Sequence, residues 1–503
     1  MKTPSLHYHS ATSYSRRGMN NRGLDWAHQP TLVKSYPLDL PKVTLPSFGT
    51  VTPASLWDLS DANPVPKVLG LDHLTSILDL TLTLTAKAKH PSGDFYYYRS
   101  AASAGALYPN EIYVCIHDVE GLKPGVYHHD VFTRQLTTIR KRPTRQLLAV
   151  ALAGNNQDAS ITLFITAIVN RSAWKYGERA YRYVLLDAGH VLQNLLFALE
   201  ALGIPFSSGY DFMDASVNSL LGLEEPKEAC LAYVKIHALN PSPVSVERLD
   251  PVPELSESIR SAARTADVEL EYPMIYDIHR SGDMENTRFP GDYDTPGPSF
   301  SGPKLENPIK ITPLKEFPDS LPYPQALFLR RSKRNFIRKT LSFEQLIQLL
   351  VLLDVQSSTG GQGIRHYSKS ITTGFLAENV QGLENGFYRC DFDQHSFGLM
   401  KPGHFQPLMA SVCLDQNWLT HAGLHFLFMA SLNDVDHQWG SRGYRYAMME
   451  AGRLGQALYV GATALGLGCC GIGALFDSEA QELLELNQDS FLCYLVALGP
   501  VKS

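Results

Sequence analysis

The chain has 503 residues, more than a single hydrophobic core usually supports, so two or more domains are expected. Apolar residues make up 44% of the chain and charged residues 19%, a composition that excludes a disordered protein. The formal net charge of -6 gives no general electrostatic reason to bind nucleic acid. The apolar stretches are far shorter than the ~20 residues of a membrane helix, the N-terminus has no signal-peptide core, and the cysteines show no zinc-type spacing. We therefore expect a cytoplasmic protein that binds no metal, no membrane and no nucleic acid.

The first half of the chain alternates helical and extended patterns. Apolar residues at helical spacing predict a helix over 71–84 and a long helix over 179–202, which ends at Gly203. Alternating and continuous apolar runs predict strands over 111–116, 161–169 and 229–236. The first half is therefore expected to be α+β.

A segment rich in Pro, Gly, Ser and Asp follows, over about 240–322, and predicts a long extended connection. After it the same order of patterns returns. Helices are predicted over 343–353 and 442–465 and strands over 424–430 and 491–498. The expected organisation is an N-terminal half over 1–239, a linker over 240–322 and a C-terminal half over 323–503.

The second half also repeats the first in its residues. Tyr176-Gly-Glu-Arg-Ala-Tyr-Arg recurs as Trp439-Gly-Ser-Arg-Gly-Tyr-Arg, and Gly121-Leu-Lys-Pro-Gly-Val-Tyr recurs as Gly382-Leu-Glu-Asn-Gly-Phe-Tyr. A third match joins 69–74 to 341–346. Three matches in the same order, with slightly different offsets, indicate a tandem duplication with small insertions and deletions.

Three motifs carry a resemblance to a known family. They are Arg99-Ser-Ala-Ala-Ser-Ala-Gly-Ala-Leu-Tyr-Pro109, Lys175-Tyr-Gly-Glu-Arg-Ala-Tyr-Arg182 and Arg330-Arg-Ser-Lys-Arg-Asn-Phe336. Each half resembles the nitroreductase superfamily, in particular its azoline-dehydrogenase branch, the flavin enzymes of thiazole- and oxazole-modified peptides. The resemblance implies two three-layer α/β/α halves with a mixed, mainly antiparallel sheet. It also implies FMN in an interface, here between the halves of an intrachain pseudo-dimer able to act as a monomer.

The resemblance assigns Arg330, Ser332 and Arg334 to the FMN phosphate. Guanidinium groups form charge-assisted, bidentate bonds to phosphate, and a serine hydroxyl adds a donor. The alternative is a solvated basic run. Without a gap, these three residues align with Asp58, Ser60 and Ala62 of the first half, where an aspartate would repel a phosphate. The N-terminal half is therefore expected to have lost its own anion site.

A loop of small residues, 102–106, is assigned to the face of the flavin through Ala102, Ser103, Ala104 and Ala106. Small side chains let a backbone approach a flat ring. The alternative is a tight turn before a strand. The aligned residues of the second half include Arg365, His366 and Tyr367, which are bulky. One composite site thus keeps both pieces and the mirror site has lost both, which predicts one FMN per chain.

The glycine-rich loop after the second long helix is assigned to the flavin ring through Gly471, Ile472 and Gly473. A backbone N–H beside the ring would stabilise the reduced flavin. The alternative is a glycine-rich helix stop. The neighbouring Cys469 and Cys470 are expected to be structural, because buried cysteines are more often inert than reactive.

Lys175 and Tyr176 resemble the acid/base pair of the azoline branch, and the second copy has Gln438 and Trp439 instead. The alternative is a surface lysine beside a packing tyrosine. Arginines and a tyrosine that both copies keep are expected to be structural: Arg179, Tyr181 and Arg182 with Arg442, Tyr444 and Arg445. Asp187 and Glu450 are expected to be the buried partners of these arginines.

The expected function is that of an FMN-dependent oxidoreductase, with oxidation of azolines to azoles in a modified peptide as the favoured reaction. The substrate is a small molecule or a peptide, and the choice between NAD(P)H and O2 as redox partner stays open. One alternative is a generic NAD(P)H-dependent nitro or quinone reductase. The other is a non-catalytic flavin-binding partner in a biosynthetic complex.

Overall fold

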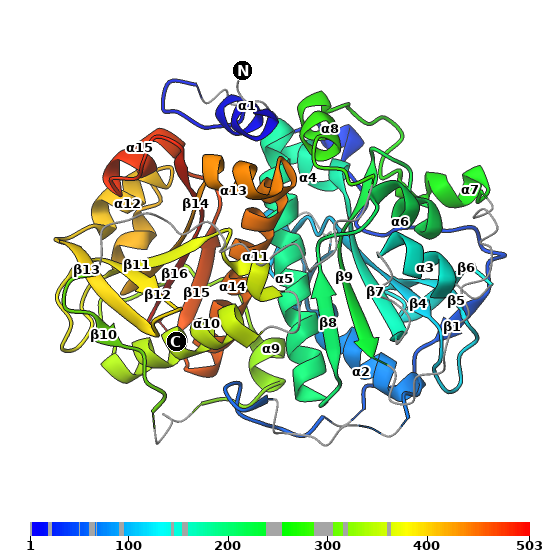
Figure 1. The fold of residues 1–503 in the computed structure, drawn as a ribbon, viewed down its shortest axis with the longest axis horizontal. Helices are drawn as coiled ribbons and strands as arrows, with labels where there is room; N and C mark the ends of the chain where they lie inside the picture. The colour runs from blue at the N-terminus through cyan, green and yellow to red at the C-terminus, as the bar shows by residue number, and fades with distance from the viewer. Residues whose placement is uncertain are drawn as a thin grey trace.

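The computed structural model describes residues 3–18, 23–49, 51–59, 66, 68–89, 95–141, 145–152, 159–237, 254–285, 305–314, 320–359 and 364–502. They form two halves of the same architecture, each with a seven-stranded sheet that has helices on both faces (Figure 1). The predicted pair of three-layer α/β/α halves is confirmed. The domain limits at 239/240 and 322/323 stay a prediction.

The two sheets share one strand order. The first runs β1 (Lys42–Thr44), β6 (Gln135–Arg140), β5 (Gly125–Asp130), β4 (Asn110–Ile116), β7 (Ala159–Ile168), β9 (Glu228–His237) and β8 (Phe206–Gly209). The second runs β10 (Ile309–Lys310), β13 (Ser396–Pro402), β12 (Gly386–Asp391), β11 (Thr372–Ala377), β14 (Leu424–Ser431), β16 (Ser490–Gly499) and β15 (Gly468–Ile472). Every pairing between these described strands is antiparallel, so the sheets are not mixed within the described residues.

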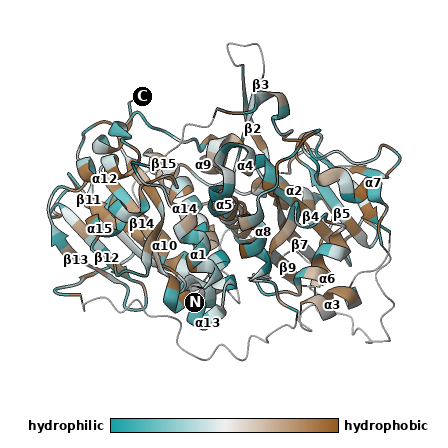
Figure 2. Ribbon diagram, turned by 90° about the horizontal axis from the view of Figure 1, so that it is seen from above, coloured by the Kyte–Doolittle hydropathy of each residue, from teal (hydrophilic) through white to brown (hydrophobic). Residues whose placement is uncertain are grey.

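Five helices of each half also correspond to one another. In the first half they are α2 (Leu71–Thr81), α3 (Arg145–Ala151), α4 (Val169–Tyr176), α5 (Ala180–Ala201) and α6 (Asp214–Leu221). In the second half they are α10 (Phe343–Thr359), α12 (Gln406–Val412), α13 (Leu432–Trp439), α14 (Arg442–Ala464) and α15 (Asp477–Leu483). The shorter α9 (Gln325–Leu329) and α11 (Ile364–Ser368) accompany the second set, and β2 (Leu84–Lys89) and β3 (Phe95–Arg99) form a separate ribbon that projects from the body (Figure 2).

Strand β4 explains why the strands are apolar on both faces. Ile112, Val114 and Ile116 point into the central core, whereas Tyr113 and Cys115 point into the outer core below α3 and α6. Successive residues of a strand face opposite sides of a sheet, so a sheet covered on both faces needs a continuous apolar run. The same rule holds for β14 in the second half.

The long helices α5 and α14 cross in the centre of the molecule, with one sheet on either side (Figure 1). A Cβ added at Gly189 would lie 2.1 Å from the carbonyl oxygen of Met449, and one added at Gly452 would lie 2.1 Å from that of Leu186. The backbones therefore touch at a pair of glycines that the duplication relates. The predicted packing of the halves through these helices is confirmed.

Burial accounts for the apolarity of the first of these helices. The stretch Val169–Ala201 is long and apolar enough to cross a membrane, but 94% of its apolar window is buried inside the protein. An all-round apolar helix is what a core position requires.

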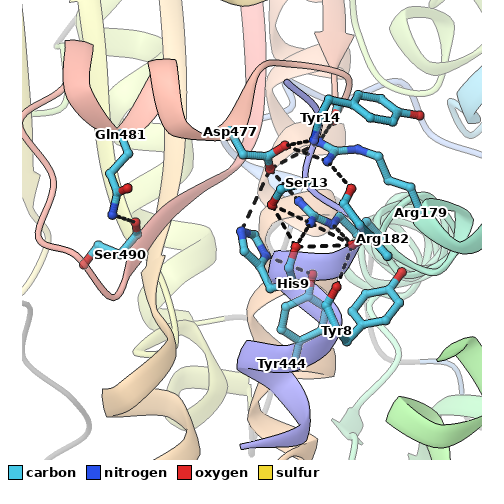
Figure 3. Close-up of polar contacts among 12 residues, drawn as sticks. Tyr8, His9, Ser13, Tyr14, Arg179, Arg182, Tyr444, Asp477, Gln481 and Ser490 are labelled. Carbon is cyan, nitrogen blue, oxygen red and sulfur yellow. Dashed lines mark hydrogen bonds and ion pairs between the residues drawn. The ribbon is translucent and has the colours of Figure 1, made fainter. Parts of the chain in front are cut away.

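The two halves form buried ion pairs with each other at the N-terminal end of α5. Asp477 of the second half accepts hydrogen bonds from Arg179 Nη1 at 2.7 Å and from Arg182 Nη1 at 2.6 Å, both on the first half (Figure 3). It also accepts the Tyr14 N–H at 2.8 Å. The carboxylate and both guanidinium groups are almost fully buried, so they are stable only as a set.

A second set of ion pairs repeats this arrangement, with the arginines on the second half and the aspartate on the first. Arg442 Nη1 and Arg445 Nη1 of the second half donate to Asp214 of the first at 2.6 and 2.9 Å. The expected partners, Asp187 and Glu450, are therefore wrong for these arginines. Glu450 pairs with Arg453 on its own helix at 2.8 Å. The side chain of Asp187 points into a cavity described below.

The segment expected to be an extended linker contains helices in its described part, 254–285. They are α7 (Glu257–Arg260) and α8 (Pro273–Arg280). Helix α8 receives Arg445 at the carbonyl of His279, just as α1 (Pro4–Ala11) receives Arg182 at the carbonyl of His9. The duplication therefore extends to these helices, which lie against each other (Figure 1). The linker residues 305–314, with strand β10, and 320–322 are also described, whereas 240–253, 286–304 and 315–319 lie outside the described residues.

We expect Asp214→Asn to lower the stability of the protein in a pH-dependent way. Burial alone would raise the pKa of Asp214, but Arg442 and Arg445 outweigh it and lower the pKa from 3.8 to about 2. A lowered pKa adds stability above pH ~4 that disappears as the pH falls towards 2, a contribution of about 2 kcal/mol. Urea unfolding at several pH values should show that the deficit of the variant shrinks between pH 5 and 2.5. The exposed Asp393→Asn is the control, and a deficit independent of pH would contradict the assignment.

Candidate functional site

A cavity of about 230 Å³, partly open to solvent, lies between the two halves. The first half lines it with residues 102–105 and with one face of α5. The second half lines it with Ser332, Arg334, Tyr459 and residues 470–474. Since both halves contribute walls, neither half forms this cavity alone.

The wall from the first half is a loop held in an unusual conformation. Gly105, Ala106 and Tyr108 all have positive φ, at 66°, 55° and 45°. Such values are costly for residues with side chains, so other contacts must hold the loop. Ser103 Oγ accepts the Tyr108 N–H at 2.9 Å and donates to Asp187 Oδ2 at 2.6 Å. Of the predicted loop residues, Ala102, Ser103 and Ala104 line the cavity and Ala106 does not.

The wall from the second half is built on β15, the edge strand of its sheet. Gly471 N–H donates to the hydroxyl of Tyr459 at 2.6 Å, and the same hydroxyl is 2.9 Å from Ser332 Oγ. Lys333 N–H donates to the carbonyl of Cys469 at 2.8 Å. The basic segment and the glycine loop are therefore joined into one surface, and the predicted Gly471, Ile472 and Gly473 all line the cavity.

The predicted arginines differ in their placement. Arg334 lines the cavity and is exposed to solvent. Arg330 is buried behind the wall, where its Nε donates to the carbonyl of Ser100 at 2.7 Å and its Nη2 to that of Arg99 at 2.9 Å. Arg330 therefore joins the two halves through hydrogen bonds. Phosphate binding by Arg330 stays a prediction.

Lys175 and Tyr176 are the last two residues of α4. Tyr176 lines the cavity, and burial raises the pKa of its hydroxyl, which therefore stays protonated. Lys175 is exposed at the rim. A Cβ added at Gly105 would lie 2.6 Å from the Tyr176 hydroxyl and 3.2 Å from Lys175 Nζ, so both groups lie over the small-residue loop.

Sequence reasoning missed the polar face of α5. Tyr183, Asp187 and His190 line the cavity at helical spacing. Burial raises the pKa of Asp187 to about 7, although its bonds from Ser103 and the Ala104 N–H lower it. A comparison of the copies carried the signal, because position 190 is histidine in the first and its counterpart, Arg453, is arginine in the second.

His190 is a neutral imidazole whose hydrogen bonds fix its tautomer. Burial lowers its pKa to about 4. Gln456 Oε1 can only accept, so His190 Nδ1 donates to it at 2.7 Å. His190 Nε2 therefore accepts from the Tyr494 hydroxyl at 3.1 Å. The floor of the cavity is polar but carries no cation at this point.

The mirror position, related to this cavity by the duplication, is filled with side chains. Tyr367 packs on Tyr210 and Tyr446, with ring centroids 4.6 and 4.8 Å apart. Trp439 Nε1 donates to His366 Nε2 at 2.8 Å. These described residues occupy the place that the small-residue loop leaves open on the other side.

The cavity suits a flat ring with a phosphate tail. Its facing walls are small residues and glycines, and its exposed edge carries Ser332 and Arg334. Its volume is below the roughly 300–1,000 Å³ of an enclosed ligand pocket, but its open side leaves the tail of a ligand room outside. Burial raises the pKa of Cys470, whose thiol therefore stays protonated. The residues present fit FMN.

A second polar group is already neutralised. Asp214, His279 and Asp283 have ligand-type atoms within 4.8 Å of one another. Arg442 and Arg445 bind the carboxylate of Asp214, and Arg445 also binds Asp283. The two arginines thus supply the positive charge that a metal cation would otherwise bring to these carboxylates.

We expect Gly471→Ala to destabilise the protein by about 1–3 kcal/mol, the usual cost of overpacking with a lost hydrogen bond. Its Cβ would lie 1.8 Å from the Tyr494 hydroxyl, which would have to leave His190. Urea unfolding measures the loss. The control is Gly466→Asn in the same segment, because nothing lies within 4 Å of its Cβ position and asparagine tolerates positive φ. Equal losses in both variants would contradict the close packing of Gly471.

Comparisons with known proteins identify the family of the chain and a solved structure of similar fold. The nitroreductase family model matches residues 61–236 and 328–500, one segment in each half, which confirms the tandem duplication. The crystal structure of a nitroreductase-like protein from Anabaena variabilis superposes with a TM-score of 0.78 over 100% of both chains at 25% identity.

Two curated relatives are similar over shorter regions. The trifolitoxin-processing protein TfxB of Rhizobium leguminosarum bv. trifolii is 28% identical over 207 residues, which cover 40% of this chain and 56% of the relative. The microcin B17-processing protein McbC of Escherichia coli is 25% identical over 134 residues, which cover 25% of this chain and 49% of the relative. The chain thus spans about half the length of each of these relatives.

Proposed function

Because the chain belongs to the nitroreductase family, we propose that it is an FMN-dependent oxidoreductase with one composite flavin site per chain. The observation that carries this proposal is the cavity between the halves, whose two walls come from the two copies. When bound, FMN would supply two-electron transfer. The filled mirror position supports a single site rather than two.

The lining residues have distinct roles in this proposal. Arg334 and Ser332, at the exposed edge, would hold the phosphate. Residues 102–105 and 471–473 would flank the ring, since all but Ile472 are alanine, serine or glycine and Ile472 is packed in a hydrophobic core. Tyr176 keeps its proton at neutral pH and is therefore a hydrogen-bond donor beside the loop. Arg330 would act indirectly, because it holds the basic segment against the carbonyls of Arg99 and Ser100.

For the substrate, we propose an azoline in a modified peptide. Two relatives are named as processing proteins, of trifolitoxin and of microcin B17, and Lys175 and Tyr176 occur together in one copy only, over the retained loop. Removal of hydrogen from an azoline needs a base for the proton, and because Tyr176 keeps its own proton we assign this role to Lys175 at the rim. The open side of the cavity leaves room for a substrate larger than a metabolite.

A generic NAD(P)H-dependent nitro or quinone reductase is the second candidate. It is favoured by the exposure of Lys175, which lies at the rim rather than among the lining residues. Hydride from a nicotinamide arrives without deprotonation of carbon, so a protein base is not needed there. A non-catalytic flavin-binding role in a biosynthetic complex would leave the same cavity and no turnover.

We expect one FMN per 503-residue chain and a weaker affinity in Arg334→Ala. Loss of one charge-assisted contact costs about 1.5–3 kcal/mol, or roughly 10- to 100-fold in Kd. Absorbance of released flavin gives the stoichiometry and fluorescence quenching gives the affinity. Arg338→Ala removes a cation of the same exposed segment outside the cavity and is the matched control. A ratio near two, or equal affinities in all three proteins, would refute the composite site.

We expect Lys175→Ala and Tyr176→Phe to slow oxidation of a synthetic thiazoline-containing peptide by ~10²–10⁴-fold, the usual yield of general acid–base catalysis. Both variants should keep FMN and reduce a quinone with NADPH at a near-normal rate. Stopped-flow bleaching of the flavin measures both reactions. The exposed Lys339→Ala is the control for loss of a surface charge. A wild type that reduces quinones but never oxidises the thiazoline would favour the generic reductase.

A further inference from the structure

The cavity contains one carboxylate among its described lining residues, that of Asp187. The residue is 4% exposed. Its oxygens accept Ser103 Oγ–H at 2.6 Å and Ala104 N–H at 3.1 Å. Neither donor is charged, and no ion pair to Asp187 occurs within the described ranges. A buried carboxylate with only neutral donors is costly to keep ionised.

In the second half, the carboxylate at the equivalent position has a charged partner. Glu450 occupies the corresponding site on α14 and accepts Ser368 Oγ–H at 2.9 Å, as Asp187 accepts Ser103. Arg453, three residues further along, pairs with Glu450 at 2.8 Å. The first half has His190 in place of this arginine, and burial keeps that imidazole neutral. The halves therefore share the carboxylate–serine bond and differ in its countercharge.

The groups that face Asp187 from the other elements do not supply that charge. Tyr176 from α4, Tyr108 from the loop and Tyr494 from β16 are all near enough to be affected by Asp187, and burial raises the pKa of each. They are therefore neutral near pH 7. On α5 itself, Tyr183 accepts a hydrogen bond from Arg179, whose charge Asp477 balances.

The nearby cations are also committed elsewhere. Arg330 donates to two backbone carbonyls, and Arg334 lies at the exposed edge of the opposite wall. Asp187 thus faces the cavity without a countercharge from any element packed around it in the described structure.

We propose that Asp187 is the proton-binding residue of this cavity, which takes up a proton from solvent when the cavity fills. A ligand that displaces water removes the hydration that favours the carboxylate, and the phosphate of FMN adds negative charge. Both effects favour the carboxylic acid. This inference rests on the proposed function, since it takes FMN as the ligand.

Protonation would change what the site offers a ligand. The carboxylate only accepts hydrogen bonds, whereas the carboxylic acid also donates one. An acid at Asp187 would stand beside Ser103 and near Tyr176, so at this point the cavity wall would offer a ligand two neutral donors, Asp187 and Tyr176, in place of a carboxylate. In the filled mirror position the charged pair of Glu450 and Arg453 cannot provide this donor.

The test is proton uptake on FMN binding, measured by titration calorimetry of the full-length, flavin-stripped chain. Each titration is run from pH 5.5 to 8.5 in two buffers that differ in ionisation enthalpy. Because burial brings the pKa of Asp187 to about 7, half of these carboxyls are ionised at pH 7 before FMN binds. Wild type should therefore take up about half a proton more per FMN than Asp187→Asn at this pH. The FMN phosphate, with a second pKa of about 6, contributes equally to both proteins.

Two further variants sharpen the assignment. Glu200 lies on the same helix outside the cavity, and burial also raises its pKa to about 7, so Glu200→Gln should leave the uptake unchanged. Ser103→Ala removes a hydrogen bond that lowers the pKa of Asp187, so the uptake should move to higher pH. Asparagine keeps the acceptor oxygen at 187 and is the least disruptive replacement.

The outcomes separate the two proposals. Binding of one FMN with the same proton count in wild type and Asp187→Asn would overturn this inference alone. If Asp187→Asn does not fold, an uptake in wild type that Ser103→Ala leaves at the same pH would overturn it equally. A wild-type chain that binds no FMN would overturn both this inference and the proposed function.

Discussion

Each half of the chain donates two arginines at the start of its long helix to one buried aspartate of the other half. Arg179 and Arg182 reach Asp477, and Arg442 and Arg445 reach Asp214. A buried charge that loses its partner costs about 3–5 kcal/mol, so the halves cannot move apart without large losses at both aspartates. The glycine contact between α5 and α14 fixes their separation at the centre. The cavity lies between the halves that these contacts hold together, so its shape depends on them.

The cavity and its mirror position have equivalent surroundings, but the first is open and the second is filled with side chains. On one side the small loop at 102–105 leaves space, and Asp187 lies at its edge. On the other side Tyr210, Tyr367 and Tyr446 fill the space and Arg453 neutralises the acid. The pairs of arginines that hold the halves together remain in both copies. The contacts between the halves thus use both copies alike, whereas the cavity is formed on one side only.

The sequence was sufficient for the fold and for the two walls of the cavity. The apolar patterns predicted the long helices and the strands β4, β7, β9, β14 and β16, although the first helix ends at Thr81 rather than residue 84. The complete sheets were implied by the family resemblance. Comparing the copies also identified the walls, since each survives in one copy only. What the pattern could not give was the direction of individual side chains. Arg330 and Arg334 look alike in a basic run, yet only the backbone carbonyls of Arg99 and Ser100 decide which one is buried.

The partners of the arginines that both copies keep show a second limit of prediction from the sequence. Asp187 is eight residues from Arg179 on nearly the same helix axis, a rise of roughly 12 Å, which is too far for an ion pair. Asp214 and Asp477 recur at one spacing from the arginines of their own copies, and this spacing was visible in the sequence. Their pairing across the halves was not, because a repeat shows that two residues are equivalent and not that they meet. Only the crossed geometry of α5 and α14 brings each aspartate to the other copy.

The crossed ion pairs also bear on the order in which the chain can be completed. Arg179 and Asp477 are 298 positions apart, and the second of them comes near the end of the chain. During synthesis the N-terminal half emerges first, with the apolar face of α5 and two arginines still lacking their cover. That face stays open until nearly the whole second half has followed, because its cover consists of α14 and Asp477. A chain that stops in the linker would therefore expose the surface that the finished protein buries most deeply, which makes the first half dependent on its own duplicate for solubility.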